Sequence, residues 1–136
     1  MIGELESLIA WIQSISDWGM LVIIWMVQVY SYPRFLKIDR ERFIRWHQRY
    51  MRQIGWFVGP LMIGQAIAGI AAIYLQPSPR SGLYLGLVVL TWGLTFLIAA
   101  PLHRKLQEKG KDPDTIRRLI RWNWSRSLVW TAIVFV

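Results

Sequence analysis

Cysteine is absent from this chain of 136 residues. Its absence excludes disulfide bonds, thiolate metal ligands and cysteine nucleophiles. Acidic residues are also scarce, since eight Asp and Glu stand against 16 Lys and Arg, for a net charge of +8. Five of the eight acids fall in predicted loops and helix starts: Asp39, Glu41, Glu108, Asp112 and Asp114. Inward-facing carboxylates are therefore too few for a dinuclear iron site.

We expect neither a cleaved signal peptide nor a long linker. The N-terminal segment MIGELESLIA carries acids where a signal peptide has a positive n-region, and it has no small-residue cleavage pattern. No long linker, low-complexity run or internal repeat interrupts the chain. The length and this continuity predict a single domain over residues 1–136.

What the chain does have is apolar sequence. Hydrophobic residues make up 54% of it, with nine tryptophans. This composition is typical of a small helical bundle in lipid. Four apolar stretches predict spans at about residues 12–31, 54–75, 83–101 and 116–136. We therefore predict an all-α fold, a four-helix transmembrane bundle with up-down-up-down topology.

The basic residues gather in two clusters between these stretches. Seven lie between Arg34 and Arg52 and seven between Arg104 and Arg121, while Arg80 and Arg126 stand alone. Positive charge marks cytoplasmic loops, so residues 33–53 and 102–121 are predicted to be cytoplasmic and both termini outside. The expected location is a bacterial inner membrane. We expect anionic headgroups, and not nucleic acid, to be the partner of these loops. A homo-oligomer is left open.

Several residues predict where helices begin, end or bend. The first helix is expected to stop at Pro33, and Asp39 to cap the second. A kink is expected at Pro60, a helix end at Gly110 and a new start at Pro113. Small residues of the second span predict close helix packing: Gly64, Ala68, Gly69 and Ala72.

Antiparallel connectivity gathers the inner ends of all four predicted helices. A layer of polar side chains is expected there, within sequence that is otherwise apolar. These residues predict a ligand-binding site near the cytoplasmic ends: Gln28, Tyr32, His47, Tyr50, His103, Asn123 and Arg126.

Arg126 stands inside the fourth predicted span. At about 1.5 Å rise per residue it lies roughly 15 Å from the C-terminal end of its helix. An arginine at the bilayer centre costs about 2.5–3.5 kcal/mol on insertion scales, so it needs polar partners or water. Three roles remain open from sequence: snorkelling to the cytoplasmic headgroups, hydrogen bonding between helices, and ligand binding. Asp17 is the nearest intramembrane acid.

The two histidines, His47 and His103, allow several roles. Each can form ordinary interface hydrogen bonds, move protons, or bind a metal or haem iron. Counting along short loops places Arg118 or Leu119 opposite His103, with His47 several residues deeper in the cytoplasm. That spacing weighs against a two-histidine haem site, and no other metal site is predicted. The sequence leaves the cofactor unknown.

Two segments carry a family resemblance. APLHRKLQ followed by RWNWSRSLVW resembles the anthrone-oxygenase-like four-helix membrane proteins, and HQRYMRQIGWFVGPLM is similar to their second span. The matching positions are Pro101, Leu102 and His103, then Trp122, Asn123 and Arg126. The family usually has asparagine where this chain has His103, and often histidine where it has Trp124. The resemblance implies a pocket for a polycyclic or quinone-like substrate, with no metal required.

A second segment offers an alternative. YPRF, followed by an arginine-rich lead-in to a span with glycine and proline, is similar to the bacterial membrane protoporphyrinogen oxidase. That resemblance implies a haem-linked redox protein, although the family carries a histidine early in its first span and this chain does not. A non-enzymatic scaffold or assembly protein is the third class, so the sequence leaves open whether the protein is an enzyme.

Overall fold

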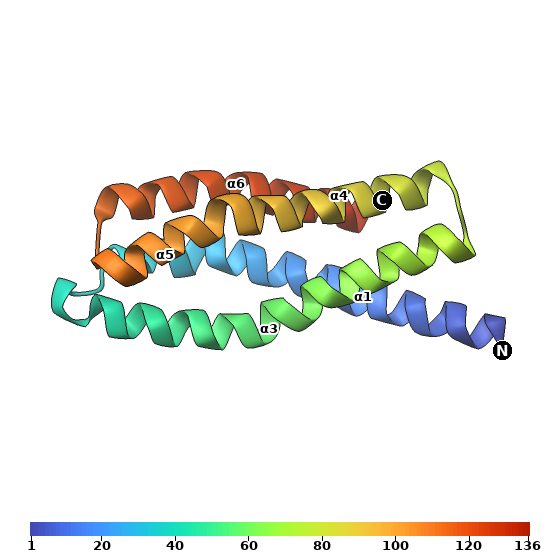
Figure 1. Ribbon diagram of the computed structural model, residues 1–136, viewed down its shortest axis with the longest axis horizontal. Helices are drawn as coiled ribbons and strands as arrows, with labels where there is room; N and C mark the ends of the chain where they lie inside the picture. The colour runs from blue at the N-terminus through green and yellow to red at the C-terminus, as the bar shows by residue number, and fades with distance from the viewer.

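The computed structural model describes residues 1–136 and is all-α (Figure 1). Two of its elements are short π-helical turns, named η1 and η2. In chain order the elements are α1 (Ile2–Met26), η1 (Val27–Ser31), α2 (Tyr32–Phe35), α3 (Arg40–Leu75), α4 (Pro79–Gly93), η2 (Leu94–Ala99), α5 (Ala100–Lys109) and α6 (Pro113–Phe135). Because the π-helical turns do not break the helices, α1 to α2 form one continuous rod, and α4 to α5 form another.

Four long helical rods therefore lie side by side, and consecutive rods run in opposite directions (Figure 1). The α2–α3 and α5–α6 loops lie together at one end of the bundle, which carries the basic clusters and is called the basic end below. Both chain termini lie toward the opposite end. The up-down-up-down order of the helices is as predicted.

Three of the four rods are long and apolar enough to cross a membrane: Ile2–Phe35, Arg40–Leu75 and Pro79–Lys109. The fourth, α6, is not among these candidate spans. Large apolar side chains cover the outside, with Trp56 77% and Leu97 79% exposed, whereas Gln65 and Ser127 are fully buried. Apolar residues outside and polar residues inside indicate an integral membrane protein, because lipid rather than water then surrounds the bundle.

The predicted end of the first helix at Pro33 is wrong, since the helix continues to Phe35. The reason is the π-helical turn before the proline, where the Tyr32 N–H donates to the Val27 carbonyl five residues back. This wider turn lets the helix pass a residue that has no N–H to donate. The same device precedes Pro101, where the Ala100 N–H donates to Thr95. In α3, which contains Pro60, Figure 1 shows a change of direction near the middle.

The other predicted helix starts and ends are confirmed in position. Asp39 stands at the N-cap of α3 and Asp112 at that of α6, with Pro113 in the first turn of α6, but neither aspartate side chain forms a capping hydrogen bond. Gly110 ends α5 with a φ of 87°, a left-handed conformation that favours glycine. Lys111 Nζ then donates to the Leu36 and Ile38 carbonyls at 2.8 and 2.7 Å, which joins the two loops of the basic end.

Two apolar clusters fill the bundle, one near each end. The first is built around Phe35, Phe43 and Leu106, and the second around Met20, Met62 and Trp130. Between α1 and α3 the helices approach closely at Gly64, where an added Cβ would lie 2.2 Å from Ser16 Oγ. This contact supports the predicted packing role of the small residues in the second span.

Candidate functional site

Six of the seven predicted site residues form one continuous chain of hydrogen bonds in the basic half of the bundle. The chain includes Gln107, which the sequence analysis did not single out. We call these residues the inner polar chain: Gln28, Asn123, Arg126, Tyr32, His103, His47 and Gln107. Its members come from the first, second, third and fourth rods. Tyr50 lies outside the chain and lines a neighbouring cavity.

The amide side chains start the chain between η1 and α6. Asn123 Nδ2 donates to Gln28 Oε1 at 2.7 Å, and Gln28 Nε2 donates to the Ile120 carbonyl at 3.4 Å. The Asn123 carbonyl oxygen is thereby turned toward Arg126, whose Nη1 donates to it at 3.0 Å. The amides therefore orient the guanidinium toward the interior of the bundle.

Arg126 is only 7% exposed and does not reach the surface of the bundle. Its Nη1 also donates to the Tyr32 hydroxyl at 3.3 Å, and the guanidinium lies 5.3 Å from the ring centre of Trp130. Asp17 pairs with other residues and forms no ion pair with it. Of the three roles left open by the sequence, snorkelling to headgroups does not match this inward orientation. The guanidinium is a buried charge compensated by neutral groups.

Both histidines lie at the same level, directly against each other. His103 Nε2 lies 2.9 Å from the Tyr32 hydroxyl, and His103 Nδ1 lies 3.0 Å from His47 Nε2. The sequence predicted that Arg118 or Leu119 lies opposite His103 and that His47 lies deeper in the cytoplasm. The predicted separation of the two histidines is wrong, because their rings are in contact. The prediction placed each histidine by its distance along the chain from the expected lipid boundary. In the structure Lys111 joins the α2–α3 loop to the α5–α6 loop, and the helices that carry His47 and His103 both meet these joined loops.

The paired histidines do not fit a two-histidine haem site. Iron held by two imidazoles lies between them, with the porphyrin separating the rings. Here the rings are hydrogen-bonded to each other, with centres 5.2 Å apart, and His47 Nδ1 lies 2.7 Å from Gln107 Oε1. All four ring nitrogens have protein partners, and the direct contact leaves no room for a macrocycle between the rings.

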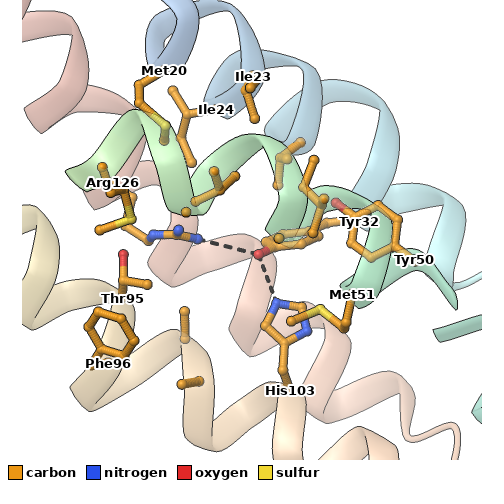
Figure 2. A pocket seen from close by; sticks show the side chains of 18 residues that line it. Met20, Ile23, Ile24, Tyr32, Tyr50, Met51, Thr95, Phe96, His103 and Arg126 are labelled. Carbon is orange, nitrogen blue, oxygen red and sulfur yellow. Dashed lines mark hydrogen bonds between the residues drawn. The ribbon is translucent and has the colours of Figure 1, made fainter. Parts of the chain in front are cut away.

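A cavity of 280 Å³ lies beside the inner polar chain (Figure 2). Its wall is mainly apolar, with side chains such as Met20, Ile24 and Met62. Its polar atoms come from Tyr32, Tyr50, Thr95, His103 and Arg126. Figure 2 shows the Tyr32 hydroxyl between Arg126 and His103 at the edge of this space.

Three buried polar atoms of the cavity residues have no partner. These atoms are the Nε of Arg126, the Oγ1 of Thr95 and the hydroxyl oxygen of Tyr50. A buried donor without an acceptor costs about 1–3 kcal/mol, and more when it is charged. In α3, a Cβ added at Gly55 or Gly59 would meet no atom within 4 Å, so the helix leaves space here. The cavity thus offers unsatisfied polar atoms and room for a ligand that would satisfy them.

Sequence reasoning missed Gln107 and Thr95. Gln107 follows His103 by one helical turn, so the i, i+4 spacing on one helix face was a usable signal. Thr95 gave no such signal, because it lies in the π-helical turn η2. The wider turn rotates Thr95 relative to α5, so regular helical spacing does not place it on the same face as His103.

A second polar cluster lies toward the opposite end of the bundle. Asp17 Oδ1 accepts hydrogen bonds from Gln65 Nε2 at 2.9 Å and from the Tyr84 hydroxyl at 2.7 Å. Gln65 Oε1 in turn accepts from Trp130 Nε1 at 2.9 Å. These residues come from four rods, so the cluster ties all of them together. Gln65, a polar residue within the apolar run of residues 54–75, was the sequence signal for this cluster.

Fold and site together define an all-α bundle with three candidate membrane spans and a polar chain buried beside a cavity. Comparison of the chain with protein-family models, with curated proteins and with solved structures finds no match. The resemblances drawn from its sequence motifs therefore stay predictions.

Proposed function

We propose that the protein is a four-span membrane protein that binds a hydrophobic polycyclic or quinone-like molecule in the cavity beside Arg126. In this proposal α6 is the fourth span, both termini lie outside, and the basic end faces the cytoplasm of a bacterial cell. The two basic clusters support the orientation, since 14 of the 16 Lys and Arg residues lie in or next to the loops of one end.

The observation that carries the proposal is the unpartnered Nε of Arg126, a buried cation beside an apolar cavity. An apolar ring system fits the wall, and an oxygen at its edge would accept a hydrogen bond from this nitrogen. Quinone carbonyls and phenolic oxygens are acceptors of this kind. The apolar wall supplies most of the affinity, and Arg126 and Thr95 fix the orientation of the ring.

The position of the cavity suggests how such a ligand enters. Gly55 of α3 and Phe96 of η2 both line the cavity, and both are exposed on the outside of the bundle. In a membrane this side faces acyl chains, where a quinone or polycyclic molecule partitions. Entry from lipid between α3 and η2 therefore requires no aqueous channel.

Binding of menadione (2-methyl-1,4-naphthoquinone) to the purified protein tests the proposal, with equilibrium dialysis as the readout. Wild-type protein and Arg45→Met, which changes an exposed arginine of α3, should bind menadione equally. Arg126→Met should weaken binding at least tenfold, since a buried hydrogen bond to a charged donor contributes about 1.5–3 kcal/mol. Equal binding by all three proteins would exclude Arg126 from the site.

A scaffold role is the second candidate, and the second polar cluster, around Asp17, favours it. Hydrogen bonds from Gln65 and Tyr84 to this carboxylate join three rods, and no cavity ligand is needed to explain them. Mass analysis of gently solubilised protein separates the two candidates. A co-purified aromatic molecule that disappears with Arg126→Met supports binding, whereas its absence from every preparation, together with no menadione binding, supports the scaffold.

A further inference from the structure

From Arg126 at the cavity to Gln107 at the basic end, the hydrogen bonds of the inner polar chain point in one direction. Gln107 Nε2 donates to the Ile44 carbonyl at 3.3 Å, which turns Oε1 of the same amide toward His47. An amide oxygen can only accept a hydrogen bond. His47 Nδ1, at 2.7 Å from it, must therefore carry a proton and donate.

This assignment fixes the protons of the next two groups. A neutral imidazole has one N–H, so His47 Nε2 accepts and His103 Nδ1 donates across the 3.0 Å contact. His103 Nε2 is then without a proton and accepts from the Tyr32 hydroxyl at 2.9 Å. The Tyr32 oxygen accepts from Arg126 Nη1, which closes the series at the cavity.

A second proton arrangement satisfies the same contacts without moving a heavy atom. If the Tyr32 proton passes to His103 Nε2, the His103 Nδ1 proton can pass to His47 Nε2. His47 becomes an imidazolium that still donates to Gln107, and the Tyr32 oxygen can take a new proton from the cavity side. The segment from Tyr32 to Gln107 therefore accommodates two proton arrangements that differ by one proton passed along it.

Burial separates this path from water. His47 and His103 are 1% and 7% exposed, and the Phe35 ring lies edge-on against both, with ring centres 5.5 and 6.1 Å away. The groups that face His47 are Phe35 from α2, Phe43 from its own helix, and His103 and Gln107 from α5. None of these groups carries a fixed charge. Within the inner polar chain the fixed charge is that of Arg126, at the cavity.

We propose that the inner polar chain is a proton relay, which takes a proton from an acidic O–H of the cavity ligand to His47. This inference rests on the proposed ligand site and narrows its ligand to a phenol or enol. The ligand O–H bond breaks and a Tyr32 O–H bond forms. The former Tyr32 proton moves to His103 Nε2, and the His103 Nδ1 proton moves to His47 Nε2. The products are a ligand oxyanion beside Arg126 and a His47 imidazolium at the basic end.

Nitrogen NMR tests the direction of the chain without any ligand. The chain has only two histidines, so ¹⁵N-histidine labelling gives two imidazole spin systems. In the ligand-free protein near neutral pH both rings should carry the proton on Nδ1 and none on Nε2. His47→Phe should leave one ring, which assigns the signals. An Nε2-protonated ring in the ligand-free wild-type protein would overturn the relay.

Binding of 2-naphthol tests the transfer itself. Free 2-naphthol is largely un-ionised at about pH 8, because phenolic hydroxyls titrate near 10. Bound to wild-type protein, its ionised fraction, read from the naphtholate absorption band, should rise about tenfold, which corresponds to one pKa unit. His47→Phe should remove this rise, although His47 does not line the cavity. The same variant should still bind 2-methoxynaphthalene, which has no proton to give.

The outcomes of this experiment separate the two proposals. Equal ionisation of bound 2-naphthol in wild type and His47→Phe overturns the relay and leaves the ligand site in place. Failure of wild-type protein to bind either naphthalene, together with failure to bind menadione, overturns the ligand site, and the relay with it. Binding of both naphthalenes, with ionisation lost only in His47→Phe, supports both proposals.

Discussion

Replacing Arg126 by methionine should remove the buried charge while keeping the length of the side chain. In the ligand-free protein two energies of opposite sign then compete. With α6 as the proposed fourth span, insertion of an arginine at the bilayer centre costs about 2.5–3.5 kcal/mol, and the variant avoids that cost. Against this, it loses two hydrogen bonds from Nη1, to Tyr32 and Asn123. In membrane proteins such bonds contribute about 0.6–1.7 kcal/mol each.

The two energies nearly cancel, so Arg126→Met should keep its free energy of unfolding within about 2 kcal/mol of wild type. Arg126→Ala removes further packing atoms next to Trp130 and should be less stable than Arg126→Met by about 2–5 kcal/mol. Arg45→Met, at an exposed position, should lie within about 0.5 kcal/mol of wild type.

Reversible unfolding in mixed detergent micelles, followed by circular dichroism, measures these differences. The informative result is a protein that keeps its stability with Arg126→Met while menadione binding is lost. A loss of more than about 4 kcal/mol for Arg126→Met would exceed what its two hydrogen bonds can contribute. That result would refute the reasoning that the guanidinium is retained for a ligand, and it would make Arg126 a structural anchor.

Three further predictions concern packing, pH and topology. Gly64→Ala should lose about 1–3 kcal/mol of unfolding free energy, because its Cβ meets Ser16 Oγ. Gly86→Ala should keep the wild-type stability, because a Cβ at Gly86 would meet no atom within 4 Å. Adding Ser16→Ala to Gly64→Ala should recover part of the lost stability, measured by thermal melts. The Thr115 hydroxyl and then the Lys105 charge lower the pKa of Asp112. The ionised Asp112 therefore stabilises the fold fully above the ordinary Asp pKa of about 4, and this stabilisation is lost as the pH falls through the lowered pKa. Thermal melts at several pH values should show that Asp112→Asn loses less stability in acid than wild type. Reporter fusions should place the C-terminus outside the cell, and an inside C-terminus would refute α6 as the fourth span.

Much of the helical organisation was predictable because it depends on local chemistry. Apolar run lengths predicted the three candidate spans, whereas the fourth predicted span, 116–136, falls on α6, which is not among them. Asp39, Gly110 and Pro113 marked helix boundaries. Pro33 misled the prediction. A proline excludes an ordinary helical hydrogen bond, but a π-helical turn before it avoids the conflict, and such a turn has no reliable sequence signal.

The candidate site was predictable as a set of residues and not as an arrangement. Polar side chains in apolar sequence must be satisfied inside the bundle, which is why Gln28, Asn123 and Arg126 could be named in advance. Their partners depend on rotation and height of each helix. The contact between His47 and His103 depends on the loops of the basic end, which are joined through Lys111.

The sequence by itself determined that this protein is a bundle of apolar helices with its positive charge at one end, because hydropathy and charge act through each residue's own solvation. Only the tertiary structure decided that the polar residues form one hydrogen-bonded chain beside a cavity. Hydrogen bonds need atoms within about 3 Å, and positions from Gln28 to Arg126 reach that distance only when four rods pack in one register.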